Sequence, residues 1–267
     1  MAISVKQPVS ISRTIGEKTI TIESGKLAKQ ATGSVVVRLG DTMSLVATVV
    51  AQGREGLDFF PLTVDYREKV YAAGKFPGGF IKREGRPSTK EILTSRLIDR
   101  PIRPLFPSTY RKEVQIQAGA ISADRENDPD VISILGASAT LVLAEDVPFF
   151  GPIGAIRLAR IDGKLVPFPT VQEMAASDLD LIVASTSQKM VMIEGFGQEL
   201  PESEMYDAIV EAHRLNQELI QLQHDLRAQA GLPPFQVPAN QPDPMIQTLH
   251  EKYANDLREA KKIQVKA

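Results

Sequence analysis

Cysteine is absent from this sequence of 267 residues. The chain therefore has no disulfide and no zinc or iron–sulfur site built on cysteine, which suits a reducing compartment. Histidine is also scarce: His213, His224 and His250 all lie in strongly helical sequence near the C-terminus. None of them has a carboxylate or a second histidine at metal-ligand spacing, so we expect no metal site.

Long apolar runs are missing as well. The N-terminal residues, MAISVKQPVSISRTIG, alternate in polarity and contain no apolar core of a signal peptide. The longest apolar stretch, residues 131–144, is about 14 residues long, includes Ser and Thr, and is too short to span a bilayer. We therefore expect a soluble, cytoplasmic protein that does not bind membranes.

Positive charge is concentrated in one segment of an otherwise acidic chain. The net charge is −2, yet residues 67–112 contain 12 Lys or Arg against 4 Asp or Glu. This segment has a balance of +8, which leaves about −10 for the rest of the chain. Such a distribution predicts an anion-binding face.

Most of the first 200 residues show the alternation that is typical of half-buried strands. Pro61 indicates that its strand lies at an edge or contains a bulge. Hairpin turns are expected at Gly16-Glu17, Gly40-Asp41 and Asp162-Gly163. The expected strands or strand pairs are VSISRTI, KTITIES, GSVVVRLG, SLVATVVAQ, FFPLTVDYRE, EVQIQAGAIS, GAIRLARIDGKLVPF and DLDLIVASTSQKMVMIEG.

Two helices interrupt these strands. The first runs from Ser88 to Arg100, opens with a capping box of Ser88 and Glu91, and is expected to stop at Pro101. The second runs from Pro129 to Leu143 and is apolar nearly all round, so we expect it to be buried. Runs of strands interrupted by helices predict an α+β fold of mixed or antiparallel sheets packed on helices.

The character of the sequence changes after Pro201. A long helix is expected from Glu202 to Ala230, then a proline-rich connector, then a helix from Met245 to the end. The last helix has no capping signal and looks cut off, which suggests a fragment. We therefore expect an α+β core over residues 1–200 and a truncated, all-helical domain over residues 201–267.

The strongest candidate site lies in Gly78–Pro107, GGFIKREGRPSTKEILTSRLIDRPIRPLFP. An aromatic ring beside cations is the minimal set of groups for holding single-stranded nucleic acid without reading its sequence. Arginine suits bidentate phosphate contacts. The nearby GKFPGGF lacks the GK[ST] of a phosphate-binding loop. The predicted nucleic-acid-binding residues are Phe80, Lys82, Arg83, Arg86, Arg96, Arg100 and Arg103, and ion pairs are an equally open alternative for the last three.

Two groups of acidic residues are candidate sites of chemistry. NDPDV, residues 127–131, is interpreted as an acidic N-cap of the buried helix rather than as a metal loop. Asp178 and Asp180 lie on one side of a strand and could act as general acid and base, but they lack a further partner. We assign no catalytic residue and no metal ligand.

The segment from Phe59 to Pro107 resembles the first core domain of the polynucleotide phosphorylase family almost continuously. Weaker likeness extends through ESGKLAKQATGSVVV, NDPDVISILGASATLVL and GPIGAIRLARIDG, and the C-terminal helices resemble the family's helical domain. The resemblance implies an RNase PH-like core followed by the start of that helical domain. It also implies an RNA-threading ring of three subunits, with a second core and RNA-binding modules absent from this chain.

The resemblance also assigns individual positions. The family's channel loop reads Phe-Phe-Arg-Arg and grips RNA. At these positions this chain has Phe80, Ile81, Lys82 and Arg83, so the resemblance implies that the predicted nucleic-acid-binding residues contact RNA. Where the family's active core has phosphate-binding serines, this chain has Asp128, Pro129 and Asp130, and the positions of two metal-associated aspartates and a lysine are Met174, Asp180 and Ile182. One lone carboxylate does not supply a metal site for phosphorolysis. This pattern implies the family's non-catalytic first core.

The implied function is a share in a phosphate-dependent 3′-to-5′ exoribonuclease that releases nucleoside diphosphates from RNA in mRNA turnover. Inorganic phosphate would be the co-substrate, with Mg²⁺ bound outside this chain, and proteins of RNA degradation are possible partners. Two alternatives stay open: a non-catalytic RNA-guiding scaffold subunit, and a single-core RNase PH-type enzyme that trims transfer RNA. Met174 and the helices after Pro201 disfavour the second.

Overall fold

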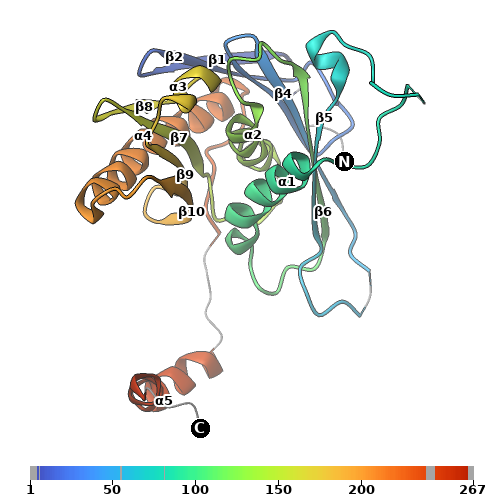
Figure 1. The fold of residues 1–267 in the computed structure, drawn as a ribbon. Helices are drawn as coiled ribbons and strands as arrows, with labels where there is room; N and C mark the ends of the chain where they lie inside the picture. Colours follow the sequence, from blue (N-terminus) through green and yellow to red (C-terminus); the bar gives the residue numbers. More distant parts are fainter. Residues whose placement is uncertain (1–4, 6, 55, 81, 239–243, 264–267) are drawn as a thin grey trace. The chain divides into compact units, whose positions relative to one another are not determined.

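The computed structural model describes residues 5, 7–54, 56–80, 82–238 and 244–263 (Figure 1). The chain divides into two compact units, Met1–Val237 and Pro238–Ala267. The first unit contains two sheets, with helices between and beside them. It has the α+β architecture that the sequence predicts.

The larger sheet has six strands in the described part of the chain, and the strand that the sequence placed at an edge, β5, forms one edge. β5 runs parallel to β6, while every other neighbouring pair is antiparallel. Gly16 and Gly40 both have a φ of 61°, which confirms the predicted tight turns. The strands, in spatial order, are β1 (Val9–Ile15), β2 (Lys18–Ser24), β3 (Gly33–Leu39), β4 (Thr42–Ala51), β6 (Glu113–Ser122) and β5 (Leu62–Glu68).

The smaller sheet is antiparallel throughout. Asp162 and Gly163 connect two of its strands with φ angles of 51° and 75°, as a two-residue hairpin turn of this kind requires. The predicted strand pairs are confirmed. In spatial order the strands are β10 (Met190–Gly197), β9 (Leu179–Ser185), β7 (Gly154–Ile161) and β8 (Lys164–Pro167).

Helix α2 (Pro129–Leu143) packs against both sheets, and all of its residues are buried (Figure 1). Two hydroxyl pairs join it to β4: Ser44 to Ser133 at 2.7 Å and Thr48 to Thr140 at 2.6 Å. These bonds satisfy polar groups that would otherwise be costly to bury. The prediction of a buried helix is confirmed.

Helix α1 (Thr89–Ile102) packs against β5 and α2. The capping box is confirmed, because the Glu91 N–H donates to Ser88 Oγ at 3.2 Å and the Ser88 N–H donates to Glu91 Oε2 at 2.6 Å. The predicted stop at Pro101 is wrong, since α1 includes Pro101. Proline in the last turn removes only one helical N–H, and a short 3₁₀ helix, η2 (Arg103–Leu105), continues the chain.

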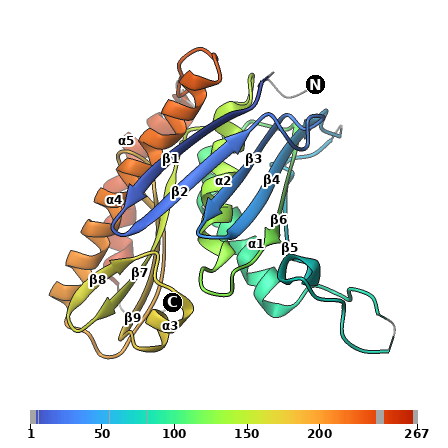
Figure 2. The same cartoon turned by 90° about the horizontal axis from the view of Figure 1, so that it is seen from above.

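Helix α4 (Glu202–Gln229) lies along both sheets and contacts β1, β7 and β9 (Figure 2). Two buried amides fix it: Asn216 donates to the Val183 carbonyl at 3.0 Å and Gln223 to the Ile153 carbonyl at 2.8 Å. By its contacts, α4 belongs to the first compact unit. The division into family domains near residue 200 stays a prediction.

The second unit contains α5 (Pro244–Lys262), close to the predicted helix from Met245. None of the residues of α5 is buried. The predicted continuation of this helix to the end of the chain falls on residues 264–267, which lie outside the described residues. A search of the helices in the described ranges finds none with the length and apolarity needed to cross a membrane.

Candidate nucleic-acid interface

Part of the basic segment, residues 69–88, connects β5 to α1, and this connection projects from one edge of the larger sheet (Figure 2). After a short 3₁₀ helix, η1 (Val70–Ala73), the described residues up to Ser88 form neither helix nor strand. Gly74 and Gly79 have φ angles of 66° and 83°. A Cβ built at Gly74, Gly79 or Gly85 would meet no atom within 4 Å. The loop backbone is therefore open to the approach of a single strand of nucleic acid.

Two phenyl rings on this loop are almost completely exposed. Phe80, predicted from the sequence, has an exposed fraction of 102%, and Phe76 has one of 91%. Neither ring contacts another aromatic ring in the described part of the chain. Phe76 was not among the predicted residues, although an aromatic residue in a Gly- and Pro-rich loop beside Lys75 is a usable signal.

The predicted loop cations Lys82, Arg83 and Arg86 are all exposed. None of the three forms an ion pair with a described residue. Ile81, the aliphatic position of the loop motif, lies outside the described residues. Three cations beside an exposed ring are thus free to meet an external anion.

The three helix arginines separate into two kinds. Arg96 is exposed and forms no ion pair within the described ranges. Arg100 bonds Glu194 of β10 at 2.6 Å, which joins α1 to the smaller sheet. Arg103 bonds Asp99 through two nitrogens, at 2.9 and 2.5 Å. The structure therefore gives Arg100 and Arg103 internal partners and leaves Arg96 without one.

Arg103 also belongs to a stripe of polar side chains that covers the outer edge of β5. Edge strands carry unpaired backbone groups, which invite pairing with another chain unless they are covered. The members of the stripe are Glu91, Ser95 and Arg103. Their spacing of four and then eight residues predicts that they lie on one side of the helix. Its bonds run from the Glu68 N–H to Glu91 Oε1 (2.9 Å), from the Tyr66 N–H to Ser95 Oγ (3.0 Å), and from Arg103 Nη2 to the Leu62 carbonyl oxygen (3.0 Å).

A second cluster of charges lies at the N-terminus of α2. Asp128 is the N-cap, as predicted, and accepts from the Asp130 N–H at 3.2 Å. Asp130 accepts from the Val131 N–H at 2.6 Å and pairs with Arg157 at 3.2 Å. Arg157 also bonds both oxygens of Asp180, at 2.8 and 2.6 Å. The chain's own carboxylates therefore occupy amides that a phosphate would need.

The ionisation of this cluster follows from its burial. Burial, together with the neighbouring Asp128 carboxylate, raises the pKa of Asp130 to about 6, although Arg157 opposes the shift. Burial lowers the pKa of Arg157, but the Asp180, Asp130 and Asp128 carboxylates outweigh it and hold that pKa above its ordinary value. Arg157 thus stays charged between three carboxylates.

Lys90 extends the cluster toward β5. Its ammonium pairs with Glu68 at 2.9 Å and with Asp128 at 3.2 Å. Burial lowers the pKa of Lys90, but these two carboxylates outweigh the effect and raise it. Burial and then Glu68, which accepts from the Tyr66 hydroxyl at 2.8 Å, raise the pKa of Tyr66. Both cations of the cluster are thus already paired with carboxylates of this chain.

The other candidate positions from the sequence, Asp178, Met174 and Ile182, are not part of this charge cluster. Asp178 pairs with Arg160 at 2.7 Å. Met174 is half-buried in α3 (Val171–Ala175), and Ile182 is buried in β9. In the described part of the chain, no group of three or more His, Cys, Asp and Glu side chains could hold a metal ion.

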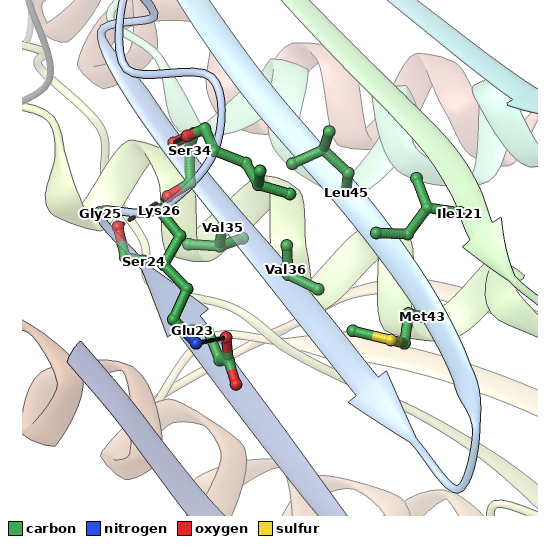
Figure 3. Close-up of a pocket in the computed structure, with 11 residues that line it drawn as sticks. Glu23, Ser24, Gly25, Lys26, Ser34, Val35, Val36, Met43, Leu45 and Ile121 are labelled. Carbon is green, nitrogen blue, oxygen red and sulfur yellow. Dashed lines mark hydrogen bonds and ion pairs between the residues drawn. The ribbon is translucent and has the colours of Figure 1, made fainter. Parts of the chain in front are cut away.

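A small cavity lies over β2, β3, β4 and β6 (Figure 3). It measures about 80 Å³, and apolar side chains such as Val36, Met43 and Leu45 line much of it. Its one cation, Lys26, pairs with Glu23 at 2.8 Å. Ligand pockets usually measure at least about 300 Å³. This cavity is therefore too small and too apolar to hold a nucleotide.

Comparison with known proteins agrees with this architecture. The family described as "3′ exoribonuclease family" matches through its domain 1 over residues 16–145 and through its domain 2 over residues 151–214. A chain of the Archaeoglobus fulgidus exosome with RNA bound to the active site is similar with a TM-score of 0.58 at 20% identity, over 81% of this chain and 87% of that one. Rice Rrp46 is similar with a TM-score of 0.60 at 13% identity, over 82% and 93%. These likenesses confirm the predicted RNase PH-like core.

Among curated relatives, the polyribonucleotide nucleotidyltransferase of Rhodopirellula baltica is 48% identical over 256 residues, which are 95% of this chain and 34% of the relative. That of Geobacter sulfurreducens is 50% identical over 234 residues, 87% of this chain and 33% of the relative. The chain spans about one third of the length of these relatives. The predicted resemblance to polynucleotide phosphorylases is confirmed, and the chain belongs to the 3′ exoribonuclease family.

Proposed function

We propose that this chain is the RNA-guiding and ring-forming part of a phosphate-dependent 3′-to-5′ exoribonuclease. The intact enzyme would release nucleoside diphosphates from RNA in mRNA turnover, with inorganic phosphate as co-substrate. The observation that carries the proposal is the 48–50% identity, across nearly the whole chain, to polyribonucleotide nucleotidyltransferases. Because those relatives are about three times as long, the chemistry can be placed in the part that this chain does not match.

RNA binding is assigned first to the projecting loop. Phe80, Lys82 and Arg83 make the main contacts, since the ring is exposed and both cations lack internal partners in the described ranges. Arg86 and Arg96 add phosphate contacts for the same reason. The sequence left open whether the helix arginines bind phosphate or form ion pairs. The bonds of Arg100 and Arg103 to Glu194 and Asp99 favour ion pairs for these two.

The α2 N-terminus supports the absence of chemistry from this chain. Asp128 and Asp130 would repel inorganic phosphate, and their carboxylates already accept the N–H groups of the first turn. The residues present do not fit a catalytic Mg²⁺, because both oxygens of Asp180 bond Arg157. We therefore place the Mg²⁺ and phosphate sites of the intact enzyme elsewhere.

Assembly and location follow from the same family membership. We propose a homotrimeric ring for the full-length protein, with single-stranded RNA threaded past the loop. The protein would act in the cytoplasm and associate with other proteins of RNA degradation. Analytical ultracentrifugation of the longer protein tests the ring: a monomer at micromolar concentration would contradict it.

Phosphorolysis assays test the division of labour. The 267-residue chain and a full-length protein that contains it are incubated with single-stranded RNA, inorganic phosphate and Mg²⁺, and nucleoside diphosphate release is measured. We expect release by the longer protein only. Metal-dependent release by the shorter chain would overturn the non-catalytic assignment.

A non-catalytic RNA-guiding scaffold subunit is the second candidate, favoured by the fold likeness to an exosome chain. A second core with an aspartate pair and a lysine in the same gene product would exclude it. A single-core RNase PH-type enzyme that trims transfer RNA is disfavoured by Met174 and by α4, and a tRNA-trimming assay with the 267-residue chain tests it.

A further inference from the structure

Phe76 and Phe80 are more exposed than any other large hydrophobic side chain in the described part of the chain. The next most exposed such side chains, Phe196 and Ile263, have exposed fractions of only 69%. A fully buried phenylalanine stabilises a fold through the apolar area that it removes from water, and these two rings remove almost none. The fold of this chain therefore does not account for them.

The loop sequence places the two rings on either side of one turn. Pro77, Gly78 and Gly79 separate them, and Gly79 has a φ of 83°. The four Cα-to-Cα steps from Phe76 to Phe80 place these two Cα atoms at most about 14 Å apart. A turn in between brings them nearer than this limit, within the reach of a few successive nucleotides.

Cations flank both rings in a symmetric order. Lys75 precedes Phe76, and Lys82 follows Phe80 by two residues. Both lysines are exposed, and neither has an ion-pair partner among the described residues. A single strand of nucleic acid alternates flat bases with charged phosphates. The order cation, ring, turn, ring, cation is complementary to that alternation.

We propose that Phe76 and Phe80 form a two-ring clamp for the bases of single-stranded RNA, with Lys75 and Lys82 on the flanking phosphates. The clamp rests on the proposed RNA-guiding function and adds Phe76 and Lys75 to it. Phe76 supplies the second stacking surface, because it is the other almost completely exposed phenyl ring of this loop. The clamp accepts any base, because every base has a face on which a ring can stack.

A single tryptophan provides a direct test, because the chain contains none. The Phe76→Trp variant is titrated with single-stranded RNA and, separately, with inorganic polyphosphate, which has charge but no bases. We expect RNA to quench the tryptophan fluorescence and polyphosphate to leave it unchanged. Phe196→Trp, on β10, is the matched control and should respond to neither probe. An unquenched Phe76→Trp in the presence of bound RNA would overturn the clamp.

Affinity measurements separate this proposal from the function on which it rests. Phe76→Ala and Phe76→Leu should each weaken RNA binding at least about fivefold, with the salt dependence unchanged. Unchanged affinity in both, with binding weakened by Lys82→Ala and Arg83→Ala, overturns the clamp and leaves the RNA-binding loop in place. Unchanged affinity in all four variants overturns both. Full binding by Phe76→Leu alone would indicate a general apolar contact, as with a protein partner, and refute stacking.

Discussion

Asp130 gives the sharpest test of the charge cluster at the N-terminus of α2. Burial and the Asp128 carboxylate raise its pKa from 3.8 to about 6. The folded chain therefore holds this proton more tightly than the unfolded chain does. As the pH rises from about 4 to about 6, unfolding releases the proton and the folded state loses stability. At neutral pH the ionised Asp130 is thus a source of instability.

The size of the effect follows from the shift. Two pKa units correspond to about 3 kcal/mol, and about 1 kcal/mol of this is already lost at about pH 4.5. Asp130→Asn keeps the shape and an oxygen for the Val131 N–H but cannot ionise. We expect it to raise the free energy of unfolding by about 1–3 kcal/mol at about pH 8. At about pH 4.5 the change that it causes should be more destabilising by about 2 kcal/mol.

Urea unfolding of both proteins at the two pH values measures this difference. Asp162→Asn is the matched control, because Asp162 is an exposed carboxylate in a hairpin turn and forms no ion pair with a described residue. It should leave the pH dependence unchanged. The reasoning is refuted if Asp130→Asn changes stability equally at both pH values, or destabilises the protein more at the higher one.

Three further substitutions test other contacts. Arg103→Ala should lower the free energy of unfolding by about 1–2 kcal/mol, because Asp99 and the edge of β5 lose a charged donor. Arg96→Ala should leave the free energy of unfolding unchanged and reduce the salt slope of RNA binding by about one. Lower stability in urea, with an unchanged salt slope, would contradict the assignment of Arg96 to RNA. Gly154→Ala should lower the free energy of unfolding by more than about 2 kcal/mol, because the added Cβ would lie 2.5 Å from the Asn216 carbonyl oxygen. An unchanged melting temperature would contradict this close contact between α4 and β7.

Local structure was largely predictable from the sequence. The alternation in Val9–Ile15 and Lys18–Ser24 defines two strands with the observed bounds, because side chains of a strand point to opposite faces in turn. The apolar run Pro129–Leu143 predicts a buried helix for an equally local reason. Even the acidic N-cap at Asp128 could be inferred, since carboxylates favour helix N-termini.

Long-range pairing could not be predicted from such patterns. Nothing in the sequence around Asp130 indicates that its partner is Arg157 or that Asp180 shares it. Likewise, Glu194 is 94 residues from Arg100, so the helix arginines looked alike until the fold separated them. The sequence around Phe76 indicates a loop, but the near-complete exposure of its ring could not be predicted, because burial depends on the tertiary fold rather than on residue type.

The position of α4 has a practical consequence for dissecting this protein. The second family match ends at residue 214, in the middle of the helix, whereas Asn216 and Gln223 anchor the following turns to backbone carbonyls of β9 and of Ile153. Ending the chain at that point would remove the Asn216 and Gln223 donors from these carbonyls, together with Leu219, Leu222 and Leu226, which are fully buried, and would uncover the apolar surface that these leucines cover. Either match expressed separately would expose apolar surface and aggregate, so the smallest portion to produce for biochemistry extends through Val237.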